Sequence, residues 1–194
     1  MASGVLVDAN VFFSRTTRDW LFLLRNQTRG GMFTVHATVD VVAEAVYSLR
    51  REFPNAPGHL TRRVHQVILD NLDELVEDFT VDEDWPGKDP DDAHVHAAAI
   101  ACRATILLSG DKGFSGVPDD IDVLLPYEVH TTDSFFTLID DSAPDDVRAV
   151  ALEQHAYWSG RREGWQASDL ATKLAAAGCP VFSERVLRHL EDMG

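Results

Sequence analysis

Acidic residues that lie far apart in the chain follow or flank apolar segments. Asp8 follows GVLV, and the stretch DPDDAHVHAAAIACRATILLSGDKGF, residues 89–114, carries acids at both ends. Carboxylates that are brought together repel one another and raise each other's pKa unless a cation neutralises them. A set of oxygen ligands with few histidines or cysteines favours Mg²⁺ or Mn²⁺ over zinc. The chemistry to consider is therefore metal-assisted hydrolysis, in which a bound ion activates water.

The elements that must position these acids alternate between strand and helix. Apolar segments predict strands over residues 4–8, 32–36, 105–109 and 127–131. Apolar spacing predicts helices over residues 18–27, from Thr38 as N-cap to the residues before Pro54, over 58–79 either continuous or broken, and from Pro90 to about Arg103. This alternation predicts an α/β fold with a mostly parallel sheet and helices on both faces.

Such a sheet brings two of the acids to one edge. Asp8 ends the first predicted strand, and Asp111 lies just past the strand over 105–109. Ligands of open parallel sheets bind outside the carboxyl ends of the strands. Glu44 lies in the middle of a predicted helix among apolar neighbours, where an ordinary exposed residue would look the same.

Asp92 has two readings. With Asp89 as N-cap and Pro90 in the first turn, acids at the next two positions make a good helix start without any chemistry. Asp91 needs only that role, whereas Asp92 could also reach over the ends of the strands. His96 shares the helical face of Asp92, although a solvated or hydrogen-bonded helix histidine is the more common case.

Four blocks resemble a PIN domain in order and approximate spacing: VLVDANVF, the glutamate in VVAEAVYSL, DPDDAHVHAAAIACRA and TILLSGDKGF. The resemblance covers about residues 4–138. PIN domains are metal-dependent ribonucleases, most familiar as VapC-type toxins of bacterial and archaeal toxin–antitoxin pairs. The resemblance implies a PIN-like, Rossmann-like three-layer fold. It also places the acidic quartet of the family on Asp8, Glu44, Asp92 and Asp111, with Asn10 and Ser109 at the supporting polar positions.

The implied chemistry is hydrolysis of RNA. Asp8, Asp92 and Asp111 would hold one or two ions of Mg²⁺ or Mn²⁺, an activated water would attack the phosphate in line, and Glu44 would orient the water or hold the second ion. The 2′-hydroxyl is not used, so the products should end in 3′-hydroxyl and 5′-phosphate. Many relatives carry a further aspartate where this chain has Lys112, Gly113 and Phe114, which leaves the second metal site in question.

The formal net charge of −15 argues against nucleic acid at first, but basic residues are unevenly distributed. Residues 1–69 carry eight arginines against five acids, a balance of +3, so residues 70–194 carry −18. The pairs Arg50–Arg51 and Arg62–Arg63 are the candidates for RNA binding. Solvated helix faces explain any one of these arginines equally well.

The remaining chain predicts a second, helical unit, which divides the protein into a nuclease domain of residues 1–140 and an extension of residues 143–194. Ser168 and Ser183 are its expected N-caps, and Gly178–Cys179–Pro180 is an expected helix stop. The unit resembles the small helical extension of a VapC-like subgroup. Trp158 and Trp165 flank Arg161–Arg162. These aromatics could stack RNA bases, but burial against the nuclease domain is the commoner fate and the expected one.

The resemblance also implies partners. A toxin would have RNA as its substrate and a VapB-like antitoxin as its partner. The antitoxin would present an Arg or Lys to the acids and an apolar face to a groove along residues 18–27 and 38–53. The sequence leaves open whether the protein forms a homodimer. No apolar run approaches the ~20 residues of a membrane span. Asp8 interrupts the N-terminal apolar segment before it is long enough to form a signal peptide. A chain with only two cysteines suits a reducing compartment. We therefore expect a cytoplasmic protein.

Other functions remain open from the sequence. A housekeeping PIN ribonuclease in RNA processing would need the same four acids, and a PIN-like domain could bind RNA or protein without cutting. DANV also resembles the DxDx motif of haloacid-dehalogenase-like phosphatases, with Asp8 as nucleophile. Asn10 stands where that chemistry needs a second acid, which argues against the phosphatase.

Overall fold

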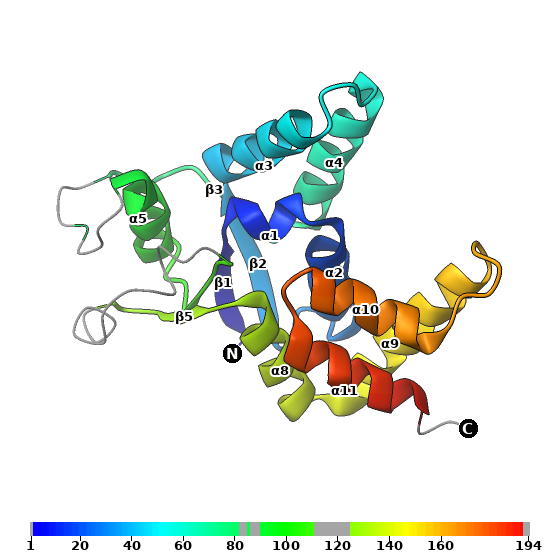
Figure 1. The fold of residues 1–194 in the computed structure, drawn as a ribbon. Coiled ribbons are helices and arrows are strands. Elements are labelled where there is room, and N and C mark those ends of the chain that lie inside the picture. The colour runs from blue at the N-terminus through cyan, green and yellow to red at the C-terminus, as the bar shows by residue number, and fades with distance from the viewer. Residues whose placement is uncertain (1, 82–84, 86–89, 111–124, 192–194) are drawn as a thin grey trace. The chain divides into compact units, whose positions relative to one another are not determined.

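A single parallel sheet organises the first part of the chain (Figure 1). The computed structural model describes residues 2–81, 85, 90–110 and 125–191. Within them the strand order is β3-β2-β1-β4-β5, and every neighbouring pair is parallel. The strands are β1 Ser3–Val7, β2 Phe33–Thr38, β3 Glu74–Val76, β4 Ile106–Leu108 and β5 Glu128–His130. The predicted α/β class with a parallel sheet flanked by helices is confirmed.

The central strand β1 explains why this order forms. Val5 pairs with Val35 of β2 on one side and with Ile106 of β4 on the other. Val5, Leu6 and Val7 are all fully buried, as expected for a strand that is covered on both faces. Strands from distant parts of the chain therefore end at the same edge of the sheet.

Four α-helices accompany this sheet within the described residues: α1 Ala9–Phe13, α3 Val39–Glu52, α4 Gly58–Asn71 and α5 Ala93–Ala101. Thr38 caps α3 as predicted, since its hydroxyl accepts a hydrogen bond from the Val41 amide at 3.1 Å. A 3₁₀ turn over Pro90–Asp92 precedes α5. This α-helix therefore begins three residues later than the sequence predicts, and Asp89, its expected cap, lies outside the described residues.

The prediction of a helix as far as residue 79 is wrong in its last part. Helix α4 ends at Asn71, and residues 74–76 form β3 instead. Asp73 explains the change, because its amide donates to the Val35 carbonyl at 2.8 Å and its carboxylate accepts from the Val35 amide at 2.8 Å. These two bonds dock the chain onto β2. Leu75 and Val76 form an apolar run too short for its periodicity to distinguish a strand from a helix, so pairing with β2 decided the outcome.

The other helices form a second compact unit, made of residues 15–30 and 132–194. Its helices are α2 Arg15–Gln27, α8 Thr132–Ser142, α9 Pro144–Ser159, α10 Ala167–Ala176 and α11 Pro180–Glu191. Three buried rings join them, with Phe182 packing edge-on against Trp20 at 5.1 Å and lying 5.2 Å from Phe136. Helix α2 thus packs with the C-terminal helices although it follows the first strand in the chain. The division into residues 1–140 and 143–194 stays a prediction.

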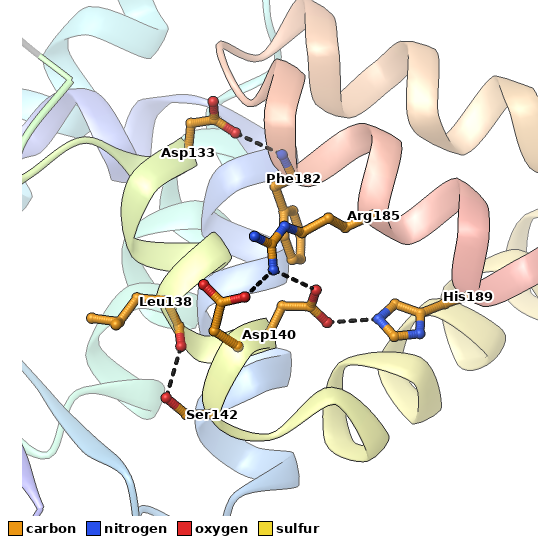
Figure 2. Close-up of polar contacts among 8 residues, drawn as sticks. Asp133, Leu138, Asp140, Ser142, Phe182, Arg185 and His189 are labelled. Atoms are coloured by element: carbon orange, nitrogen blue, oxygen red, sulfur yellow. Dashed lines mark hydrogen bonds and ion pairs between the residues drawn. The ribbon is translucent and has the colours of Figure 1, made fainter.

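Helix α11 is held by polar contacts to α8 (Figure 2). The carboxylate of Asp133 accepts hydrogen bonds from the amides of Val181 and Phe182 at the first turn of α11. Asp140, which is 7% exposed, pairs with Arg185 at 3.1 Å and with His189 at 2.6 Å. A buried carboxylate needs such partners, because an unpaired charge in this position would be costly.

The two predicted serine caps are wrong. Ser183 lies inside α11, where its hydroxyl donates to the Pro180 carbonyl, and Asp133 supplies the cap from another helix. Helix α10 is capped by Gln166 and Asp169 in a reciprocal capping box, not by Ser168. The predicted stop is confirmed, since α10 ends before Gly178, which adopts a φ of +86°.

Within the described ranges, no helix is both long enough and apolar enough to cross a lipid bilayer.

Candidate active site

The carboxylate of Asp8 lies where β1 ends and α1 begins. Asp8 is 9% exposed and is the N-cap of α1. Its Oδ1 accepts from the Ala9 amide at 2.6 Å, and its Oδ2 accepts from Asn10 Nδ2 and from Ser109 Oγ, each at 2.6 Å. Three donors on one carboxylate fix its orientation.

Asn10 and Ser109 connect this carboxylate to the neighbouring strand. The Asp8 amide donates to the Leu108 carbonyl at 2.9 Å, which continues the pairing of β1 with β4. Asn10 Nδ2 also donates to Ser109 Oγ at 3.3 Å, and Asn10 Oδ1 accepts from the Gly110 amide at 2.8 Å. A Cβ at Gly110 would lie 3.2 Å from that same oxygen, so a glycine leaves room for the bond. The two predicted supporting residues thus both touch Asp8.

A cavity of about 450 Å³ opens beside this junction. Residues of three segments line it: Asp8, Ala9, Asn10 and Phe13 from the β1–α1 junction, Glu44, Ser48, Arg51 and Glu52 from α3, and Asp92, His94 and Val95 from the start of α5. Three of the four predicted acids therefore face one cavity. Asp111 directly follows Gly110 in the sequence, but it lies outside the described residues, as do Lys112, Gly113 and Phe114.

Helix α3 contributes one of its faces to this cavity. Glu44, Ser48, Arg51 and Glu52 are separated by four, three and one residues, which places them on one side of an α-helix. The same helix buries Val41, Val42 and Ala45. Although Glu44 lies in the middle of the helix among apolar neighbours, it is exposed and lines the cavity.

The capping role considered for Asp92 receives little structural support. Asp92 occupies the N-cap position of α5, yet no hydrogen bond of its side chain caps that helix. Its charge acts elsewhere, because burial and then the negative charge of Asp92 raise the pKa of Tyr127 well above its ordinary value. Tyr127 is 5% exposed and its hydroxyl lies 2.7 Å from His96 Nδ1.

His96 is therefore a hydrogen-bonded helix histidine that does not line the cavity. Its ring lies 4.9 Å from that of Trp85 and 5.8 Å from that of Tyr127, and burial lowers its pKa. The sequence analysis did not predict a role for Tyr127. The only available signal was its position at the start of a short apolar segment, which does not indicate a partner 31 residues away.

The two adjacent arginines of α3 have different surroundings. The guanidinium of Arg50 donates to the carbonyls of Pro54 and Ala56 and to the hydroxyl of Thr61, and so it fastens the connection from α3 to α4. Arg51 instead lines the acidic cavity. Arg62 and Arg63 are exposed on α4. RNA binding by these four residues stays a prediction, and Arg51 is the member that already lies among the acids.

The donor set of the cavity fits a hard divalent cation. Asp8, Glu44 and Asp92 offer only carboxylate oxygens, which Mg²⁺ and Mn²⁺ prefer. Within residues 2–81, 85, 90–110 and 125–191, no three His, Cys, Asp or Glu side chains are close enough to hold an ion. Asp111 would have to complete the set.

An apolar cavity of about 600 Å³ lies along the other side of α3. It is lined mainly by Val39, Val42, Val46 and Tyr47 of α3 and by Leu69 of α4. The sequence analysis expected a groove along residues 18–27 and 38–53. The described cavity uses α3 and α4, and α2 belongs to the second unit.

Comparison with known proteins finds one relationship. A family model described as PIN domain matches residues 4–113, which is more than half of the chain and includes all four predicted acids. Neither the curated proteins nor the solved structures include a match to the chain. The resemblance seen in the sequence is confirmed over this range, and the VapC-like character of the C-terminal helices stays a prediction.

The Asp8 junction predicts a difference between two serines of the same cavity region. Ser109 is 1% exposed and donates to the Asp8 carboxylate, so Ser109→Ala should lower the free energy of unfolding by about 1–3 kcal/mol. Ser48 lines the cavity but makes no side-chain hydrogen bond to any described residue, so Ser48→Ala should stay within about 0.5 kcal/mol of wild type. Urea unfolding measures both, and equal losses would contradict the structural role of the Ser109 bond.

Proposed function

Because the chain belongs to the PIN domain family, we propose that it is a metal-dependent endoribonuclease that hydrolyses phosphodiester bonds of RNA. PIN domains are generally nucleases, which supports hydrolysis as the reaction. The observation that carries the proposal is the cavity shared by the carboxylates of Asp8, Glu44 and Asp92 at the edge of the sheet.

The residues of the cavity divide the work of such a reaction. Asp8, Asp92 and Asp111 would hold Mg²⁺ or Mn²⁺, which when bound activates water and stabilises charge on the phosphate. Asn10 and Ser109 hold the Asp8 carboxylate in one orientation, so that it loses little entropy in binding. Glu44 would orient the attacking water. Arg51, on the same wall, offers a guanidinium to a phosphate oxygen of the RNA.

We further propose that the protein acts in the cytoplasm as the toxin of a type II toxin–antitoxin pair. The resemblance to VapC-type proteins supports this role. The partner would be a VapB-like antitoxin that places an Arg or Lys among the carboxylates of the cavity, where it would compete with metal. A nuclease of RNA processing would share the cavity but not the antitoxin.

Metal dependence tests the reaction. Cleavage of single-stranded RNA should require Mg²⁺ or Mn²⁺, stop in excess EDTA, and leave 3′-hydroxyl and 5′-phosphate ends. Asp92→Asn should lower cleavage at least ~100-fold, yet change the free energy of unfolding by at most about 1 kcal/mol, because its side chain does not cap α5.

The matched control for this variant is Asp145→Asn, the same change at an exposed acid in the first turn of α9. It should cut RNA at the wild-type rate, as measured on a labelled oligonucleotide. Full cleavage in excess chelator, or full activity of Asp92→Asn, would contradict the metal mechanism.

Expression in a bacterial host tests the toxin role. The wild-type protein should arrest growth when it is expressed alone, and Asp8→Ala should abolish the arrest because it removes the carboxylate at the centre of the junction. Co-expression of the protein encoded directly upstream should restore growth. Arrest that persists in Asp8→Ala would rule out the nuclease as its cause, and a harmless wild type that cuts RNA in vitro would favour RNA processing.

A further inference from the structure

The second compact unit contains a pocket whose charge is opposite to that of the chain. The protein has 32 acids against 17 lysines and arginines. A pocket of about 210 Å³ in this unit is nevertheless lined by Arg15, Arg162 and Lys173 and by one acid, Asp19. In so acidic a chain, three cations around one small pocket point to an anionic ligand.

Two tryptophans give this pocket an aromatic wall. The rings of Trp158 and Trp165 lie 5.6 Å apart at an angle of 27°. The guanidinium carbon of Arg15 lies 5.2 Å from the centre of the Trp158 ring, and that of Arg162 lies 5.0 Å from the same ring and 5.6 Å from Trp165. Cation–π contacts of this kind restrict a guanidinium before any ligand arrives, so less entropy is lost when it binds a phosphate.

Two of the three cations and one further donor of the pocket lack acceptors among the described residues. Among the described residues, the side chains of Arg162 and Lys173 form no ion pair or hydrogen bond, whereas Arg15 pairs with Asp19 at 3.3 Å. The indole nitrogen of Trp165 is buried without a hydrogen-bond partner in the described structure. A ligand with anionic and neutral acceptor atoms would satisfy these groups.

We propose that this pocket binds one nucleotide of a single-stranded RNA, with its phosphate at Arg162 and Lys173 and its base against the tryptophan rings. Aromatic side chains beside cations are the usual means of binding single-stranded nucleic acid without sequence preference. The pocket is smaller than the roughly 300–1,000 Å³ of sites that enclose whole drug-sized ligands, so it suits a single base of a longer chain. This inference rests on the proposed function, because it takes the RNA to be the substrate.

Binding of a labelled RNA oligonucleotide to the full chain tests the inference. It is measured by fluorescence anisotropy in EDTA at several salt concentrations, with the RNA checked for integrity on a gel. Removing both cations in Arg162→Gln with Lys173→Gln should reduce the log–log salt slope by about 0.7, for the one phosphate contact that is lost, and weaken binding roughly 5-fold at 0.1 M salt. The control carries the same loss of charge outside the pocket, as Arg148→Gln with Arg188→Gln, and should be affected far less.

A second comparison tests contact with the base. An abasic oligonucleotide with the same backbone should bind the wild type about 5- to 150-fold more weakly than RNA, and Trp158→Leu should reduce that difference. Equal binding of both oligonucleotides to the wild type would overturn base recognition. Equal losses in the two double variants would overturn the pocket as a phosphate site.

The cleavage assay separates this inference from the proposed function. In Mg²⁺ the Arg162→Gln, Lys173→Gln variant should have a raised KM and an unchanged kcat, since neither residue lines the acidic cavity. A wild type that cuts RNA, together with a double variant that binds like its control, would refute the pocket and leave the nuclease. A wild type that binds RNA through these residues without cutting it would refute the nuclease and leave the pocket.

Discussion

The hydrogen bonds on the Asp8 carboxylate are the interaction on which the rest of the site depends. They join two segments at the edge of the sheet, the β1–α1 junction and the end of β4, since the donors are the first amide of α1, the side chain of Asn10 in the same helix, and the hydroxyl of Ser109. Such bonds can form only if β1 and β4 are neighbours and end level with each other, which the pairing of Val7 with Leu108 ensures. The topology of a parallel sheet thus turns a separation of 101 residues into a contact of 2.6 Å. A carboxylate bound in this way is already oriented before it meets a ligand, which is the condition for a precise site.

Helix α3 serves two purposes because its sides differ in composition. Helix α3 buries its apolar side against the core and turns Glu44 and Arg51 to the acidic cavity. One residue earlier, Arg50 lies about 100° around the helix and instead binds the carbonyls that follow the helix end. Adjacent arginines that look equivalent in the sequence therefore have separate roles. In the second unit, positive charge is concentrated in one pocket. Arg162 and Lys173 lie there beside tryptophans, whereas most acids of the chain lie elsewhere.

Much of the fold and part of the site can be predicted from the sequence, because both depend on local patterns. Apolar runs located β1, β2 and β4, and the order of motifs identified Asp8, Glu44 and Asp92, which do share a cavity. What failed depended on partners distant in sequence. Residues 74–76 became a strand because β2 offered an unpaired edge, Ser183 lost the capping role to Asp133 of another helix, and helix α8 was not predicted at all. The acidic residues themselves were found through a family pattern, and the position of Asp111 lies outside the described residues.

Titration of the full-length protein with Mn²⁺, followed by calorimetry or by the electron paramagnetic resonance signal of the free ion, measures the central claim directly. The claim is that Asp8 at the end of β1 and Asp92 at the start of α5 form one cation site together with Asp111, with Glu44 of α3 in the same cavity. Wild-type protein should then bind Mn²⁺ saturably, Mg²⁺ should displace it, and Glu44→Gln should weaken binding because it removes one charge from the cavity. Glu128→Gln, which removes an exposed acid of β5 that does not line the cavity, should bind as the wild type does. Absence of saturable binding, or equal weakening by Glu44→Gln and Glu128→Gln, would contradict the site.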